Sequence, residues 1–209
     1  MLESRIADAE LDIEYFAQTV AASFPWSPRP TDTAKAQAPS NPVHVLLHGD
    51  GAIPLHRELR RLLPALRSTV LASAEEIAVL QRIHGSVSGL EYVTQDAQAL
   101  PAADHAVLIQ QLPQTNDESV LQIVTRLWQA LPATGYLSVM DDVLAIEDID
   151  AHDLETDLLH RVLDRGHLRT DQEIRDLLTQ VGAGEPKRIN IGWGVMLYSL
   201  TPAVHTQEN

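Results

Sequence analysis

Residues 43–55 read Val-His-Val-Leu-Leu-His-Gly-Asp-Gly-Ala-Ile-Pro-Leu, and this stretch decides the fold. The apolar run at 43–47 is typical of a buried strand, and the two glycines after it allow a sharp turn. Pro54 suits the first turn of a helix, whose apolar face would continue through Leu55, Leu59, Leu62, Leu63 and Leu66. A strand, a glycine turn and a helix in this order predict the first unit of an α/β fold.

The same alternation of strands and helices continues along the chain. We expect further strands at 68–72, 90–94, 104–110 and 136–140, a helix that begins near Ser73, and helices at about 120–131, 153–165 and 171–181. Ser73 with Glu76, and Thr170 with Glu173, have the spacing of helix capping boxes. The sequence therefore predicts a doubly wound, mostly parallel, Rossmann-like α/β sheet.

Two β-rich runs close the predicted fold. They cover residues 188–191 and 195–200, and Gly192, Trp193 and Gly194 join them. Such a pattern predicts a hairpin, with Trp193 packed at its tip or over the sheet edge. The sheet should thus end in an antiparallel β pair.

A separate helix is expected before this domain, at residues 1–24. Its apolar residues recur at alternating spacings of four and three, in Leu2, Ile6, Ala9, Ile13, Phe16 and Val20. This stripe is either a docking or dimerisation arm or a face that packs on its own domain. Residues 25–42 are rich in proline and predict a linker, residues 43–201 form the α/β domain, and residues 202–209 form a tail.

Composition limits the function of this protein. The 209 residues include 15 lysines and arginines against 29 acidic residues, a net charge of −14, which repels nucleic acids and anionic membrane surfaces. The absence of cysteine excludes a thiol nucleophile and a cysteine-ligated metal. The first residues lack a signal-peptide pattern, and no apolar run is long enough to span a membrane. We expect a cytoplasmic protein with no nucleic-acid or membrane partner.

Polar residues follow several predicted strands, at the edge where open α/β sheets bind ligands. His48 and Asp50 follow the first strand, and Asp141 and Asp142 follow the fifth. Histidine side chains ordinarily change protonation near neutral pH, so His48 is a candidate proton carrier, while Asp141 would orient it or the substrate. The alternatives are an ordinary turn at Asp50-Gly51 and a solvated loop or helix cap at the two aspartates.

The histidines of the later helices give one further candidate. His160 is a second possible proton carrier, and its alternative is a helix-surface histidine beside Arg161. His152, His160 and His167 are spaced by eight and seven residues, which does not bring all three together on one helix face. We therefore predict no metal site.

Several short strings resemble a known family. They are Gln95-Asp96-Ala97, Leu100-Pro101-Ala102-Ala103-Asp104, Leu131-Pro132-Ala133-Thr134-Gly135-Tyr136-Leu137 and Arg169-Thr170. From about residue 12 to residue 200 the chain resembles the C-terminal domain of class I S-adenosylmethionine-dependent O-methyltransferases that modify small aromatic or polyketide molecules. The resemblance implies a cofactor loop at Gly49 and Gly51, an adenine contact at Asp96, and a single neutral ribose contact from Ser73.

The departures from this family bear on function. Leu47 stands where the family has an acidic residue, and Ile53 replaces the third glycine of the loop and would crowd the cofactor. Ala72-Ser73 stands where a carboxylate normally binds both ribose hydroxyls, and Pro113 takes the place of the histidine base. Members usually carry a substrate-binding and dimerisation domain of about a hundred residues, for which only the first helix stands here.

Three functions follow from the resemblance and its departures. In the first two, O-methylation is lost. The first is a tailoring enzyme of natural-product biosynthesis that catalyses ring closure, rearrangement or elimination of a small molecule. The second is a stabilising subunit of an enzyme partner. The third is a methyltransferase with an altered base. We expect no bound cofactor, with S-adenosylmethionine as the alternative, and a homodimer or a heteromeric partner docked through the first helix.

Overall fold

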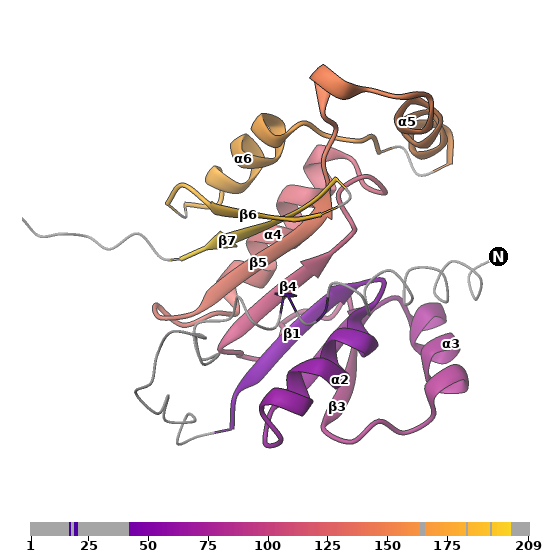
Figure 1. The fold of residues 1–209 in the computed structure, drawn as a ribbon. Helices are drawn as coiled ribbons and strands as arrows, with labels where there is room; N and C mark the ends of the chain where they lie inside the picture. Colours follow the sequence, from indigo (N-terminus) through magenta and orange to yellow (C-terminus); the bar gives the residue numbers. More distant parts are fainter. Residues whose placement is uncertain are drawn as a thin grey trace, which may run out of the picture. The chain divides into compact units, whose positions relative to one another are not determined.

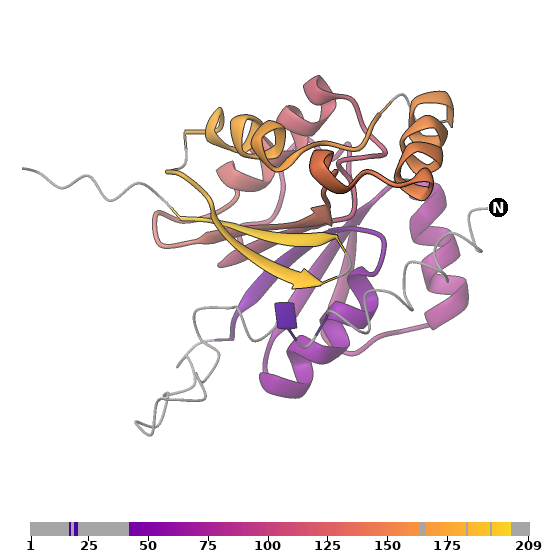
Figure 2. The same cartoon turned by 45° about the horizontal axis from the view of Figure 1, so that its top comes forward.

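The computed structural model describes residues 17, 19–20, 42–163, 166–182, 184–192 and 194–201. The chain divides into two compact units, residues 1–103 and 104–209, and each is described by itself. Figures 1 and 2 show the elements of both units.

The first unit is a three-stranded parallel sheet with two helices. β1 (His44–Gly49) pairs with β2 (Arg67–Ala72), and β2 pairs with β3 (Leu90–Thr94), all in parallel register. Parallel neighbours need a crossover connection, which α2 (Ala52–Leu62) and α3 (Ala74–His84) supply. α2 packs against β1 and β2, and α3 packs against β3. The predicted strand and helix alternation is confirmed here.

The second unit contains a mixed sheet. β4 (His105–Ile109) pairs in parallel with β5 (Tyr136–Asp142), and β5 pairs antiparallel with β7 (Val195–Leu200). β7 pairs antiparallel with β6 (Lys187–Gly192), so the predicted terminal hairpin is confirmed. Trp193, at its tip, lies outside the described residues.

Three helices belong to the second unit. α4 (Asp117–Gln129) packs against β4 and against α6 (Asp171–Thr179), whereas α5 (Ala151–Leu163) stands off from the sheet of this unit in both views (Figures 1 and 2). A short 3₁₀ helix, η1 (Ile146–Asp148), precedes α5.

Apolar strands form the core, and the polar side chains among them have partners. All five residues of β4 are buried. His105, the first residue of β4, lies 3.0 Å from the Ser138 hydroxyl through Nε2 and stacks on the ring of Tyr136. Burial lowers the pKa of His105 from 6.5 to about 3, so this imidazole is neutral at physiological pH.

Both predicted capping boxes are present, at Ser73 with Glu76 and at Thr170 with Glu173. The helix boundaries differ slightly from expectation. α2 begins at Ala52, because Gly51 adopts a left-handed conformation and serves as its N-cap, and it ends at Leu62. Leu63 and Leu66 therefore follow the helix instead of belonging to it, although Leu66 is buried.

The predicted helix at 1–24 lies almost wholly outside the described residues. Val20 is the only described residue of the stripe, and it is buried at 1 % exposure, as is Ala17 of the same predicted helix at 0 %. The use of the stripe, as a docking arm or as a face packed on its own domain, stays a prediction. No helix among the described residues is long and apolar enough to cross a membrane.

Candidate functional site

The loop after β1 turns sharply at two glycines. Gly49 and Gly51 have φ values of 115° and 80°, a conformation that favours glycine. His48, at the end of the strand, is 5 % exposed, and its Nδ1 donates a hydrogen bond of 2.8 Å to the carbonyl of Leu71. A carbonyl only accepts, so the proton of neutral His48 lies on Nδ1. The ring is thereby fixed in orientation.

Apolar side chains occupy two positions beside this loop. Leu47 is fully buried, and Ile53, in the first turn of α2, is 1 % exposed. Both side chains therefore belong to the core of the first unit. That Ile53 also crowds a cofactor stays a prediction.

Ser73 and Asp96 follow the next two strands. The Ser73 hydroxyl accepts the N–H of Glu76 at 3.2 Å, and the Glu76 carboxylate accepts the N–H of Ser73 at 2.8 Å. Ser73 is thus the N-cap of α3, and its hydroxyl keeps one proton to donate to a ligand. Asp96 lies in the turn after β3 with its side chain exposed. Their roles in cofactor binding stay predictions.

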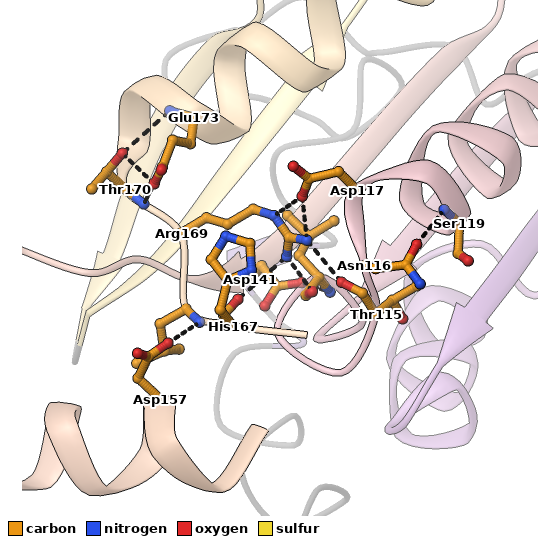
Figure 3. A network of polar contacts seen from close by, with 12 residues as sticks. Thr115, Asn116, Asp117, Ser119, Asp141, Asp157, His167, Arg169, Thr170 and Glu173 are labelled. Atoms are coloured by element: carbon orange, nitrogen blue, oxygen red, sulfur yellow. Dashed lines mark hydrogen bonds and ion pairs between the residues drawn. The ribbon is translucent and has the colours of Figure 1, made fainter. Parts of the chain in front are cut away.

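In the second unit, a buried arginine holds the loop that follows β4 (Figure 3). Arg169 is 1 % exposed. Its guanidinium donates to the carbonyls of Leu112 and Thr115, the latter at 2.7 Å, and to Oδ1 of Asp117 at 2.7 and 3.0 Å. A fifth bond of 3.3 Å reaches the carbonyl of His167. All five N–H donors of the guanidinium are therefore used.

Asp141 holds the same loop from β5. Its side chain is fully buried, and its two oxygens accept the N–H of Leu112 at 2.9 Å and the N–H of Asp142 at 3.0 Å. Burial, together with the neighbouring Asp142 carboxylate, raises the pKa of Asp141 from 3.8 to about 8. The protonated form therefore predominates at neutral pH. This geometry makes Asp141 a residue that positions the loop.

Gly166 allows this loop to lie close to the chain before Arg169. A Cβ atom at Gly166 would lie 2.1 Å from the carbonyl oxygen of Pro113 and 2.6 Å from the nitrogen of Thr115. These are backbone atoms and cannot swing aside. Pro113, at the position of the family's base, is itself buried.

His160 lies on α5, on the half-buried side of the helix. Asp157, one turn earlier on the same side, accepts the N–H of Leu168 at 2.9 Å and so ties α5 to the segment that leads to Arg169. His152 is exposed and His167 is half-buried. Among the described residues, no group of three or more histidines, cysteines or acidic residues could hold a metal ion.

The structure thus gathers the candidates into two sets. His48, Gly49 and Gly51 form one turn in the first unit, and Asp141 shares the loop of Pro113 in the second. Sequence reasoning missed the role of Arg169 and Gly166. In the sequence, Arg169 belongs only to the string Arg169-Thr170 that resembles the family. The spacing of apolar residues does not predict which arginine is buried.

Comparison with known proteins identifies the family. A family model described as an O-methyltransferase domain matches residues 44–184. The chain belongs to this family. The resemblance inferred from the short strings is therefore confirmed. No match was found among curated proteins.

Three solved proteins have the same fold. TnmH shares 22 % identity over 94 % of this chain with a TM-score of 0.75, and mitomycin 7-O-methyltransferase MmcR shares 24 % over 92 % with a TM-score of 0.72. Human N-acetylserotonin methyltransferase, solved in complex with SAM, shares 17 % over 96 % with a TM-score of 0.78. The α/β, mostly parallel fold with antiparallel terminal strands is confirmed. The chain spans 54–56 % of the length of these three proteins.

Replacing Gly166 by alanine tests the close approach of the two segments. Gly166→Ala should lower the free energy of unfolding by about 1–3 kcal/mol, because the new methyl group overlaps the Pro113 carbonyl. Gly184→Ala is the matched control, since no heavy atom lies within 4 Å of its Cβ position. Urea denaturation measures both, and equal effects would contradict the proposed contact.

The raised pKa of Asp141 gives a pH dependence of stability. Between about pH 4 and pH 8 the folded protein holds a proton that the unfolded chain has released, so this contribution to stability falls as pH rises through that window. Relative to Asp141→Asn, the wild type should lose up to about 1.4 kcal/mol per pH unit. Denaturation at pH 5 and pH 8 measures the difference, with Glu91→Gln as an exposed control. Parallel profiles for wild type and Asp141→Asn would refute the raised pKa.

Proposed function

We propose that this O-methyltransferase-family protein no longer transfers methyl groups and acts as a stabilising subunit of an enzyme partner in natural-product biosynthesis. The observation that carries the proposal is Pro113. It stands where the resemblance places the base, it has no proton-accepting side chain, and Arg169 and Asp141 fix its loop. Because this loop is fixed, another side chain has little room to reach the position that Pro113 occupies.

The cofactor side of the first unit supports the proposal in part. The turn at Gly49 and Gly51 fits the close approach of S-adenosylmethionine, which would supply the methyl group when bound. The end of β2 does not fit, because Ala72 carries no carboxylate and the Ser73 hydroxyl caps α3. We therefore derive no methyl-transfer step from these residues.

A second candidate is a methyltransferase with an altered base. The turn at Gly49 and Gly51 and the SAM-bound human relative favour it. In this case His160, on the half-buried side of α5, would take the proton of the substrate hydroxyl. A tailoring enzyme without methyl transfer would use the same histidine or His48.

Calorimetry with S-adenosylmethionine tests the loss of the cofactor site. We expect weak or absent binding, because a ribose carboxylate normally contributes charge-assisted hydrogen bonds. Ala72→Asp combined with Ile53→Gly should tighten binding by roughly tenfold or more if the site is an eroded one. A submicromolar dissociation constant for the wild type would refute the proposal.

A methyl-transfer assay on small phenols separates the two candidates. We expect no turnover by the isolated chain. If turnover occurs, the second candidate requires His160→Ala to slow it by about 10²–10⁴-fold, whereas His152→Ala, an exposed histidine of the same helix, should leave it unchanged. Turnover that survives both substitutions would remove His160 as the base and the subunit proposal with it.

A further inference from the structure

Helix α5 has its polar and apolar faces reversed. Its half-buried residues are all polar: Asp153, Thr156, Asp157 and His160. Its large apolar residues point outward instead: the exposed fractions are 59 % for Leu154, 62 % for Leu158, 55 % for Leu159, 70 % for Val162 and 66 % for Leu163. A surface helix normally turns its apolar stripe toward its own core.

Polar contacts hold α5 in this orientation. Asp157 accepts the N–H of Leu168 at 2.9 Å and the Nε–H of Arg161 at 2.7 Å. At the start of the helix, Asp150 and Asp153 exchange backbone-to-carboxylate bonds of 2.9 and 3.2 Å. The polar side is therefore anchored to the following segment through Asp157, and the apolar side is exposed.

Two exposed isoleucines precede the helix in the sequence. Ile146 and Ile149, just before α5, are 67 % and 38 % exposed. Seven of the ten exposed large hydrophobic residues in the described part of the chain lie between 146 and 163. Monomeric proteins rarely expose a contiguous apolar surface of this kind, and such surfaces mark interaction sites.

The charge on this face indicates what covers it. Glu155 precedes Leu158 and Leu159 by three and four residues and Val162 by seven, so it lies within the apolar stripe. A second copy docked face to face would bring two Glu155 carboxylates into one apolar interface, where unpaired charge is costly. The net charge of −14 opposes self-association as well. A partner with a cation opposite Glu155 meets both constraints.

We propose that the apolar face of α5 docks an amphipathic helix of a different protein, with a lysine or arginine placed against Glu155. This inference rests on the subunit role proposed above and supplies its interaction surface. The aliphatic stripe would bury the partner's own apolar residues, and Glu155 would set the register.

Two synthetic helical peptides test the proposal against the full chain. Both carry leucines at positions i, i+3, i+4 and i+7 and neutral residues elsewhere, and they differ only in a central lysine or glutamate. By fluorescence anisotropy at physiological salt, we expect the lysine peptide to bind at least about tenfold more tightly. Glu155→Lys should reverse this preference, because it reverses the charge at the centre of the face.

Control variants locate the binding. Leu158→Asp should weaken the lysine peptide at least about tenfold, whereas Ile83→Asp, at an exposed position on α3, should not. Circular dichroism verifies that both variants fold, as expected for exposed sites. Equal binding of the two peptides, no reversal in Glu155→Lys, or no effect of Leu158→Asp would overturn the proposal.

Sedimentation of the wild type measures its oligomeric state and tests whether a second copy covers this face. A dimer that Leu158→Asp dissociates would overturn the proposal in favour of a second copy. These readouts do not involve S-adenosylmethionine. Failure of the docking surface is therefore distinguishable from failure of the proposed loss of methylation, which calorimetry and turnover measure.

Discussion

The buried guanidinium of Arg169 is the interaction on which the second unit depends. A charged group removed from water must have its hydrogen bonds satisfied and its charge balanced. Here the carbonyls of Leu112, Thr115 and His167 take three donors, and Asp117 takes the other two and supplies the opposite charge. Because four of these five bonds reach the loop between β4 and the start of α4, the loop, the helix and the chain before α6 are fixed together.

Much of the fold could be predicted from the sequence, because the fold follows from local patterns. Buried strands such as β1 and β4 are apolar runs, and the capping boxes at Ser73 and Thr170 mark helix starts by their own hydrogen bonds. The close contact of Gly166 with Pro113 and the burial of Arg169 could not be predicted. They depend on segments about fifty residues apart, and one sequence carries no record of which distant segments meet.

α5 shows a different limit of sequence reasoning. The sequence predicted a helix at about 153–165, and the structure has one at Ala151–Leu163. A period gives the spacing of the two faces and does not say which face turns inward. That choice is made by Asp157, whose bond to the N–H of Leu168 holds the polar side against the protein. The candidate site has the same limit, since His48 and Asp141 follow strands as expected while their hydrogen bonds came only from the structure.

The substitutions at the family's functional positions are compatible with a stable fold. Leu47 and Ile53 are buried, so each adds apolar contact where a ligand-binding residue would carry a conformational or desolvation cost. Functional sites commonly trade stability for activity, and removing that demand allows the core to extend. The exposed face of α5 has the opposite effect. Exposed leucines lower the solubility of the isolated chain and do not stabilise its fold. Buried apolar residues at Leu47 and Ile53, together with an exposed apolar face on α5, fit the subunit role that we propose.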